Sequence, residues 1–200
     1  MIIATILLYM TLVLFVGTMG HRLFRRTGED YFVASRSIGP FILLMSLFGT
    51  NMTSVAILGA SGEAYHEGIG VFGQLASASA LIIPSVFFFV GTRVWALGKR
   101  HGFLTQAQYF RQRWDSDLFG LLLFFVLAAL MVPYLLVGVM GSGITLNQIT
   151  NNQIPEWVGA LLVCAVIMAY VTYGGMRSTA WVNTLQTLVF MSFGVIAVVI

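Results

Sequence analysis

Hydrophobic residues are gathered along this chain into long uncharged runs, which short polar or charged connections separate. The runs cover about 2–19, 38–61, 69–92, 118–142, 157–173 and 181–200. Each is close to the roughly 20 apolar residues that an α-helix needs to cross a hydrocarbon layer. The pattern therefore predicts an all-α integral membrane protein, a single transmembrane domain with six helices.

The composition agrees with this pattern, since 58% of the residues are hydrophobic and 8% are charged. An ordinary soluble domain has roughly 25% charged residues, so a soluble fold is excluded. A net charge of +3 would suggest nucleic acid in a soluble chain, but here the basic residues lie in connections, where they meet lipid headgroups. We expect the lipid bilayer, and no nucleic acid, as a partner.

The basic residues all fall in the connections that follow the first, third and fifth runs. They are Arg22, Arg25, Arg26, Arg36, Arg93, Lys99, Arg100, Arg111, Arg113 and Arg177. The alternate connections hold Glu63, Glu67 and Glu156 and neither Lys nor Arg. Cytoplasmic loops are rich in Lys and Arg, so the prediction is a multi-pass protein of the plasma (inner) membrane with its N-terminus outside. The first run lacks a preceding basic segment, which favours an uncleaved anchor over a signal peptide.

The second run is interrupted at 49–54 by the small and polar sequence Gly-Thr-Asn-Met-Thr-Ser. Within a bilayer, non-helical backbone survives only where protein buries it or where it lines a wet cavity. Transporters use such breaks, because freed carbonyls coordinate a cation and exposed N–H groups face the substrate. Gly49 would permit the backbone excursion. The alternative is a helix–helix contact, for which small and hydroxyl residues are also typical, and the spacing alone leaves both interpretations open.

Four segments of the chain, in order, resemble the sodium:solute symporter family, which includes carriers of sugars, proline, iodide, pantothenate and monocarboxylates. The first reads Asp-Tyr-Phe-Val-Ala-Ser-Arg-Ser-Ile-Gly-Pro at 30–40. The others are 46–54 with 59–62, 102–105 with 109–111 and Arg113, and Tyr-Gly-Gly-Met-Arg at 173–177 with Ala180, Trp181, Leu185 and Gln186. Together they cover nearly the whole chain.

This resemblance implies the LeuT-like inverted-repeat fold. The first run would be an extra leading helix, and the other five would form the first repeat. The second repeat would be absent, so we expect the N-terminal half of a longer transporter. The implied function is sodium-coupled symport of a small organic solute (organic acid, amino acid or sugar) by alternating access, and not an enzymatic activity. No organic cofactor is implied beside Na⁺.

The resemblance also implies a site. Sodium would bind the backbone carbonyls of Gly49 and Met52 together with oxygens from a later helix that these 200 residues do not include. The candidates for solute contact are Asn51, Thr53, Ser54 and Gln74. For Gln74, the one amide of the third run, an interhelical hydrogen bond stays open as the alternative.

Two departures from the family pattern bear on the ion. Asn51 stands where the proline carriers have an aspartate, and Asn183 stands where many members of the family have one. The resemblance therefore gives no support to a second cation or proton site that depends on these carboxylates, and one sodium ion is favoured. Two further functions stay open: a membrane sensory module of the same fold, joined to a signalling domain, and a degenerate half that serves in assembly. At the inner surface, Asp30 and Arg36 are expected to form an ion pair.

Overall fold

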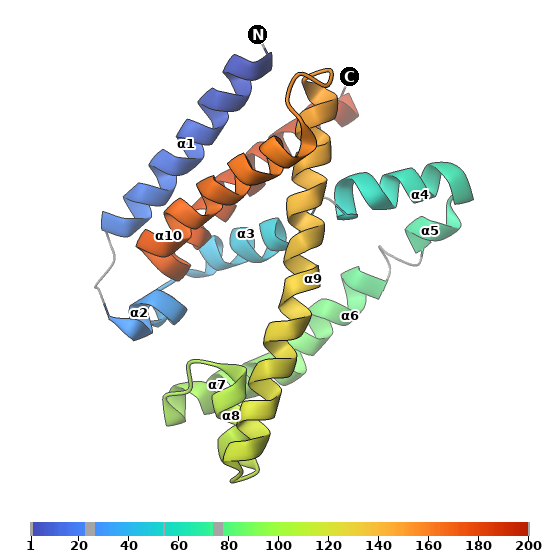
Figure 1. The fold of residues 1–200 in the computed structure, drawn as a ribbon. Coiled ribbons are helices and arrows are strands. Elements are labelled where there is room, and N and C mark those ends of the chain that lie inside the picture. Colours follow the sequence, from blue (N-terminus) through green and yellow to red (C-terminus); the bar gives the residue numbers. More distant parts are fainter. Residues whose placement is uncertain (1, 23–26, 54, 74–77, 200) are drawn as a thin grey trace. The chain divides into compact units, whose positions relative to one another are not determined.

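The computed structural model describes residues 2–22, 27–53, 55–73 and 78–199. All regular elements of these residues are helical, mostly α-helices with short 3₁₀ and π stretches (Figure 1). The all-α prediction is therefore confirmed for the described part of the chain. The residues form two compact units, 1–54 with 137–200 and 55–136.

The unit formed by 1–54 and 137–200 contains the helices that carry most of the family-like segments. Its elements are α1 (Ile2–Arg22), α2 (Gly28–Val33), η1 (Ala34–Arg36), α3 (Pro40–Asn51), the end of α9 (Asp117–Ile149) and α10 (Glu156–Val199). Helix α10 contacts α1, α2 and α3 and is thus the centre of this unit.

Helix α10 consists of two helical segments that meet at Gly175. This residue has φ 55° and ψ −144°, a conformation that residues with a side chain almost never adopt. A Cβ at this position would lie 2.6 Å from the carbonyl oxygen of Tyr31 in α2. Glycine is therefore required both for the kink and for the close approach of α2. The fifth and sixth predicted runs lie on the two sides of this kink.

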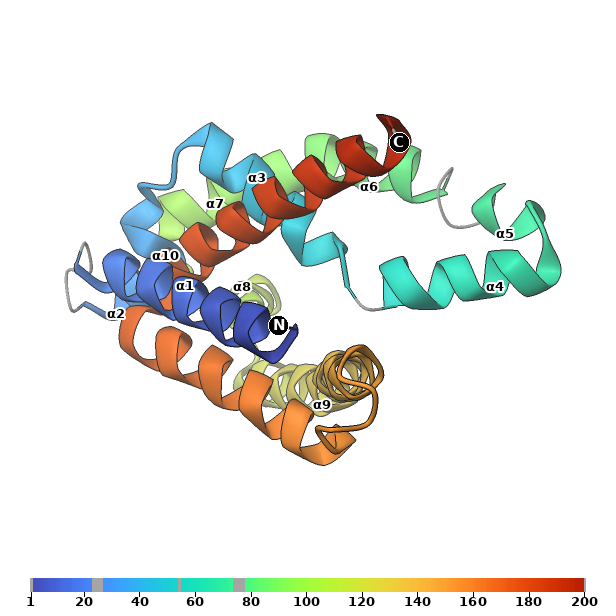
Figure 2. The ribbon, with the colours of Figure 1, turned by 90° about the horizontal axis from the view of Figure 1, so that it is seen from above.

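Helix α1 packs along α10 (Figures 1 and 2), and small residues lie at the closest approach. The buried core of this contact is Val13, Tyr170 and Val182. A Cβ at Gly17 would lie 2.5 Å from the Cβ of Tyr170, and the Ser178 hydroxyl donates to the Gly17 carbonyl at 2.6 Å. Small residues that let two backbones approach closely are typical of helix packing in membranes.

The unit formed by 55–136 is also helical. Its elements are η2 (Val55–Gly59), α4 (Ala60–Glu67), α5 (Gly70–Phe72), α6 (Ala78–Val86), η4 (Phe87–Gly91), α7 (Thr92–His101), α8 (Gln106–Arg113) and the beginning of α9. The elements α6, η4 and α7 follow one another without a gap and make one helix with a π segment, and Pro84 lies inside it. Thr105 starts α8 with a capping box that includes Gln108, which satisfies two N–H groups at the beginning of the helix.

Four helices of the described residues are long and apolar enough to cross a membrane. They cover Ile2–Gly20, Leu81–His101, Asp117–Ile149 and Glu156–Ala197. A fifth crossing is counted if Gly28–Arg36 and Pro40–Asn51, which are bent by 109° at their junction, form one span. These helices are those of a multi-pass membrane protein. The division into six crossings stays a prediction.

Candidate functional site

The second predicted run contains a break in its helix, as the polar residues at 49–54 indicate. Helix α3 ends at Asn51, and the next helical element begins at Val55. Met52 has left the helical conformation (φ −82°, ψ 63°), and its N–H group is shared between the carbonyls of Phe48 and Gly49, both at 3.2 Å. The described chain is thus non-helical at Met52 and the half-buried Thr53, within the polar segment 49–54.

The expected role of Gly49 in the excursion of the backbone is wrong. Gly49 lies inside α3, before the break, and its missing side chain serves the contact with α10. A Cβ there would overlap the hydroxyl oxygen of Thr187 and lie 3.1 Å from the carbonyl oxygen of Asn183. The glycine is needed because two helices meet at this point.

Around Gly49, four uncharged polar side chains join α3 to α10. We call these residues together with Gly49 the α3–α10 polar interface; it consists of Ser46, Gly49, Thr50, Asn183 and Thr187. The Asn183 amide donates to the hydroxyls of Ser46 (3.3 Å) and Thr50 (3.1 Å). The buried Thr187 hydroxyl donates to the carbonyl of Met45 at 2.8 Å. Ser46, Gly49 and Thr50 therefore form a contact between two helices, which is the second of the two interpretations that the sequence left open.

The predicted ligand residues divide into three groups. Gly49 and Met52 lie at the end of α3, where the proposed carbonyl ligands would be. Asn51 is exposed and donates from its amide to the Leu47 carbonyl of its own helix at 2.9 Å, while Thr53 lies at the break. Ser54 and Gln74 lie outside the described residues. The roles of all six in binding sodium or solute stay predictions.

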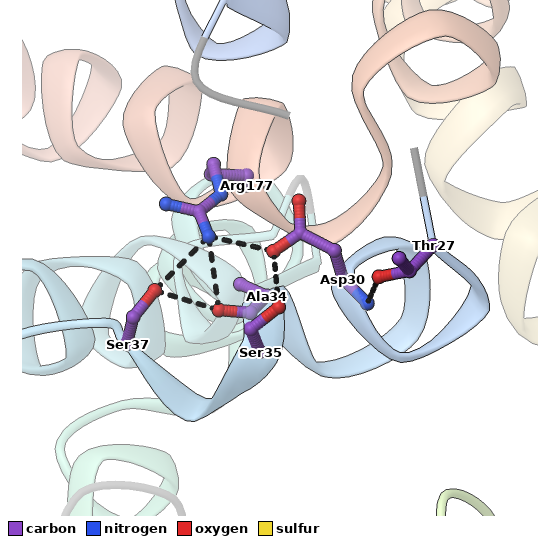
Figure 3. A network of polar contacts seen from close by, with 6 residues as sticks. All are labelled: Thr27, Asp30, Ala34, Ser35, Ser37 and Arg177. Atoms are coloured by element: carbon purple, nitrogen blue, oxygen red, sulfur yellow. Dashed lines mark hydrogen bonds and ion pairs between the residues drawn. The ribbon is translucent and has the colours of Figure 1, made fainter. Parts of the chain in front are cut away.

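A second polar cluster, shown in Figure 3, lies between α2, η1 and the residues that follow the kink of α10. The carboxylate of Asp30 is fully buried and accepts from Arg177 Nη2 at 2.6 Å. The same nitrogen donates to the Ala34 carbonyl at 3.2 Å and to the Ser37 hydroxyl at 3.0 Å. The Ser35 hydroxyl donates to the Asp30 carboxylate at 2.7 Å. We call these five residues the Asp30–Arg177 network.

Arg177 is not the partner that the sequence predicts for Asp30. The predicted ion pair was with Arg36, whereas the structure pairs Asp30 with Arg177 and places Arg36 Nε 3.7 Å from a carboxylate oxygen of Glu29. One feature of the sequence could have indicated this pair: Asp30 and Arg177 each belong to a family-like segment, and both fall on the same predicted side of the membrane. Removing one partner of a buried ion pair typically costs about 3–5 kcal/mol, because the other charge is left buried without compensation.

A multi-pass helical protein with a helix broken inside an apolar run has the architecture of membrane transporters. Comparison with known proteins gives the particular family: the profile of the sodium:solute symporter family matches residues 31–200. The chain belongs to the sodium:solute symporter family. Members of this family are transporters, not enzymes.

Curated relatives agree with this assignment. The chain is 26% identical over 167 residues to an uncharacterized symporter of Bacillus subtilis, covering 82% of this chain and 33% of the relative. It is 28% identical over 173 residues to the sodium/pantothenate symporter of Escherichia coli, covering 84% and 35%. It is 28% identical over 176 residues to the human sodium/iodide cotransporter, covering 84% and 25%.

The matched region is only part of each relative, since the chain spans between 25% and 35% of the length of these three proteins. No solved structure matches the chain.

Proposed function

We propose that this chain is the N-terminal part of a sodium-coupled symporter that carries a small organic solute by alternating access. The observation that supports this proposal most strongly is the break of α3 at Met52 and Thr53, inside the region that matches the family. A broken helix is the device by which secondary transporters offer backbone carbonyls to an ion and N–H groups to a solute. The LeuT-like inverted-repeat fold is part of the same proposal.

For the ion, we propose that the carbonyls of Gly49 and Met52 contribute to one sodium site. The six predicted runs contain no Asp or Glu, so uncharged oxygens are the ligands available within them. Two carbonyls are too few for a hard cation, and the remaining ligands would come from a later helix of the complete protein. An inside-negative membrane potential would then favour sodium entry by about 2.3 kcal/mol per charge per 100 mV.

For the solute, the candidates Asn51, Thr53, Ser54 and Gln74 are polar and uncharged. Such a pocket suits a sugar, an amino acid or an organic acid, and N–H groups at a helix end can hold a carboxylate. We favour an organic acid or amino acid. The relative named for pantothenate supports a carboxylate, whereas the relative named for iodide cautions against extending one substrate to the family. We place the protein in the plasma (inner) membrane with its N-terminus outside.

The proposed function predicts that solute binding depends on sodium. The complete protein, purified from its full reading frame, would be heated with a panel of sugars, amino acids and organic acids, in sodium chloride or choline chloride. We expect one solute class to raise the melting temperature in sodium and to have little effect in choline, because the ion and the solute would stabilise the same outward-open state. Equal stabilisation in both salts would contradict sodium coupling and would favour a sodium-independent binding protein.

A further inference from the structure

The turn between α2 and α3 has a backbone conformation that its sequence does not favour. Ala34, Ser35 and Arg36 have φ values of 50°, 49° and 55°, so three consecutive residues with side chains lie in the left-handed region. The side chain of each disfavours this conformation. A run of this kind persists only where surrounding contacts fix it, and such strain is often found in elements that switch.

The contacts that fix this turn converge on Arg177, as Figure 3 shows. The Ala34 carbonyl accepts from the backbone N–H of Ser37 at 3.1 Å, from the Ser37 hydroxyl at 2.7 Å and from Arg177 Nη2 at 3.2 Å. The same Nη2 holds the buried Asp30 carboxylate at the other end of the turn, at 2.6 Å. One guanidinium group therefore ties together both ends of a strained turn.

This turn is located where it can control the position of α3. Only two residues separate it from Gly39 and Pro40, the N-cap and first residue of that helix. On the other side, Arg177 follows the kink of α10 at Gly175 by two residues. Helix α3 is thus attached to α10 twice: along its length by the α3–α10 polar interface, and at its start by the Asp30–Arg177 network.

Stability alone does not explain why an ion pair is buried in the Asp30–Arg177 network. A buried ion pair can often be replaced by apolar residues of similar volume without loss of stability, so its presence suggests a role in selecting one conformation. Arg177 Nε is also buried without a hydrogen-bond partner among the described residues.

We propose that Asp30 and Arg177 form a latch that positions the beginning of α3 against the kink of α10 and opens during the transport cycle. The latch rests on the proposed transport function. It acts by positioning the broken helix and touches neither sodium nor solute. When the latch opens, the strained turn relaxes and α3 can move relative to α10. When it closes, the carbonyls of Gly49 and Met52, the proposed sodium ligands, return to the position that they have in this structure.

The test uses the complete protein in proteoliposomes and compares two activities. Solute exchange needs no gradient, whereas sodium-driven accumulation needs the two sides of the membrane to stay separated throughout the cycle. Asp30→Asn and Arg177→Gln remove one charge each. Arg177→Lys keeps the charge but loses the planar guanidinium group with its several N–H donors. The matched control is Glu29→Gln, which breaks the neighbouring, more exposed pair with Arg36.

With rates normalised to folded protein, we expect Asp30→Asn and Arg177→Gln to keep exchange within about twofold and to lose at least about tenfold in accumulation. Arg177→Lys would fall between them and the wild type, and Glu29→Gln would keep both activities. If the two neutral variants do not fold, Arg177→Lys serves as the test: a loss of accumulation without a loss of exchange supports the latch. Equal loss of both activities, or no loss of either, overturns it. A wild-type protein without sodium-driven accumulation would instead overturn the proposed function.

Discussion

Replacing Gly49 with phenylalanine is expected to abolish sodium-driven uptake by the complete protein. Even a Cβ at this position would overlap the Thr187 hydroxyl and press on the carbonyl of Asn183. A phenyl ring would force α3 away from α10, and the carbonyls at the end of α3 would move with it. Overpacking of this kind typically costs about 1–3 kcal/mol, and here the displaced segment is the proposed ion site.

The measurement for Gly49→Phe is the initial rate of uptake, normalised to folded protein in the membrane. Cys164→Ala is the control, because the half-buried Cys164 lies on α10 before its kink, outside the α3–α10 polar interface. We expect its uptake to be unchanged. Gly49→Ala should give a partial loss, since a single methyl group overlaps less. Uptake by Gly49→Phe at the wild-type rate would contradict both the close contact of α3 with α10 at this residue and the proposed sodium site at the end of α3.

The substitution Gly175→Ala is expected to destabilise the protein by about 2–5 kcal/mol. Part of this cost is the positive φ of 55°, which costs a residue with a side chain about 1–2 kcal/mol or more. The rest is the overlap of the new methyl group with the Tyr31 carbonyl oxygen, 2.6 Å away, because overpacking adds about 1–3 kcal/mol. The backbone of α2 would have to shift to make room.

The melting temperature in detergent measures this effect. Gly194→Ala is the matched control: it lies on the same helix α10, has no positive φ, and a Cβ there meets nothing within 4 Å among the described residues. We expect the control to melt like the wild type and Gly175→Ala to melt well below it. Identical melting of the two variants would show that the kink does not depend on glycine.

The sequence predicts the helical class and marks 49–54 as an unusual segment of its run, because both follow from local composition. Apolar runs of bilayer length require helices, and a cluster of small and polar residues within a run is costly unless the helix is interrupted or packed there. Both outcomes occur in α3: Gly49 and Thr50 pack against α10, and the interruption follows at Met52. The pattern located the unusual segment but could not assign each residue to its role.

The features that the sequence did not predict depend on contacts between distant segments. Asp30 was expected to pair with nearby Arg36, yet Arg177 reaches it across the packed interface of α2 and α10. Three left-handed residues at 34–36 contradict their own local preference, so only the surrounding network accounts for them. Gly175 belongs to a family-like segment, but the need for glycine there depends on the contact with Tyr31, which is far away in the sequence.

Sodium coupling is tested most directly by solute uptake into proteoliposomes that contain the complete protein, with an inward gradient of sodium or of choline. The solute would be the one that stabilises the purified protein in sodium. A sodium-coupled symporter is expected to accumulate the solute above equilibrium with sodium, to accumulate more with an inside-negative potential, and to show only background uptake with choline. Equal uptake with either cation would contradict a sodium-coupled symporter.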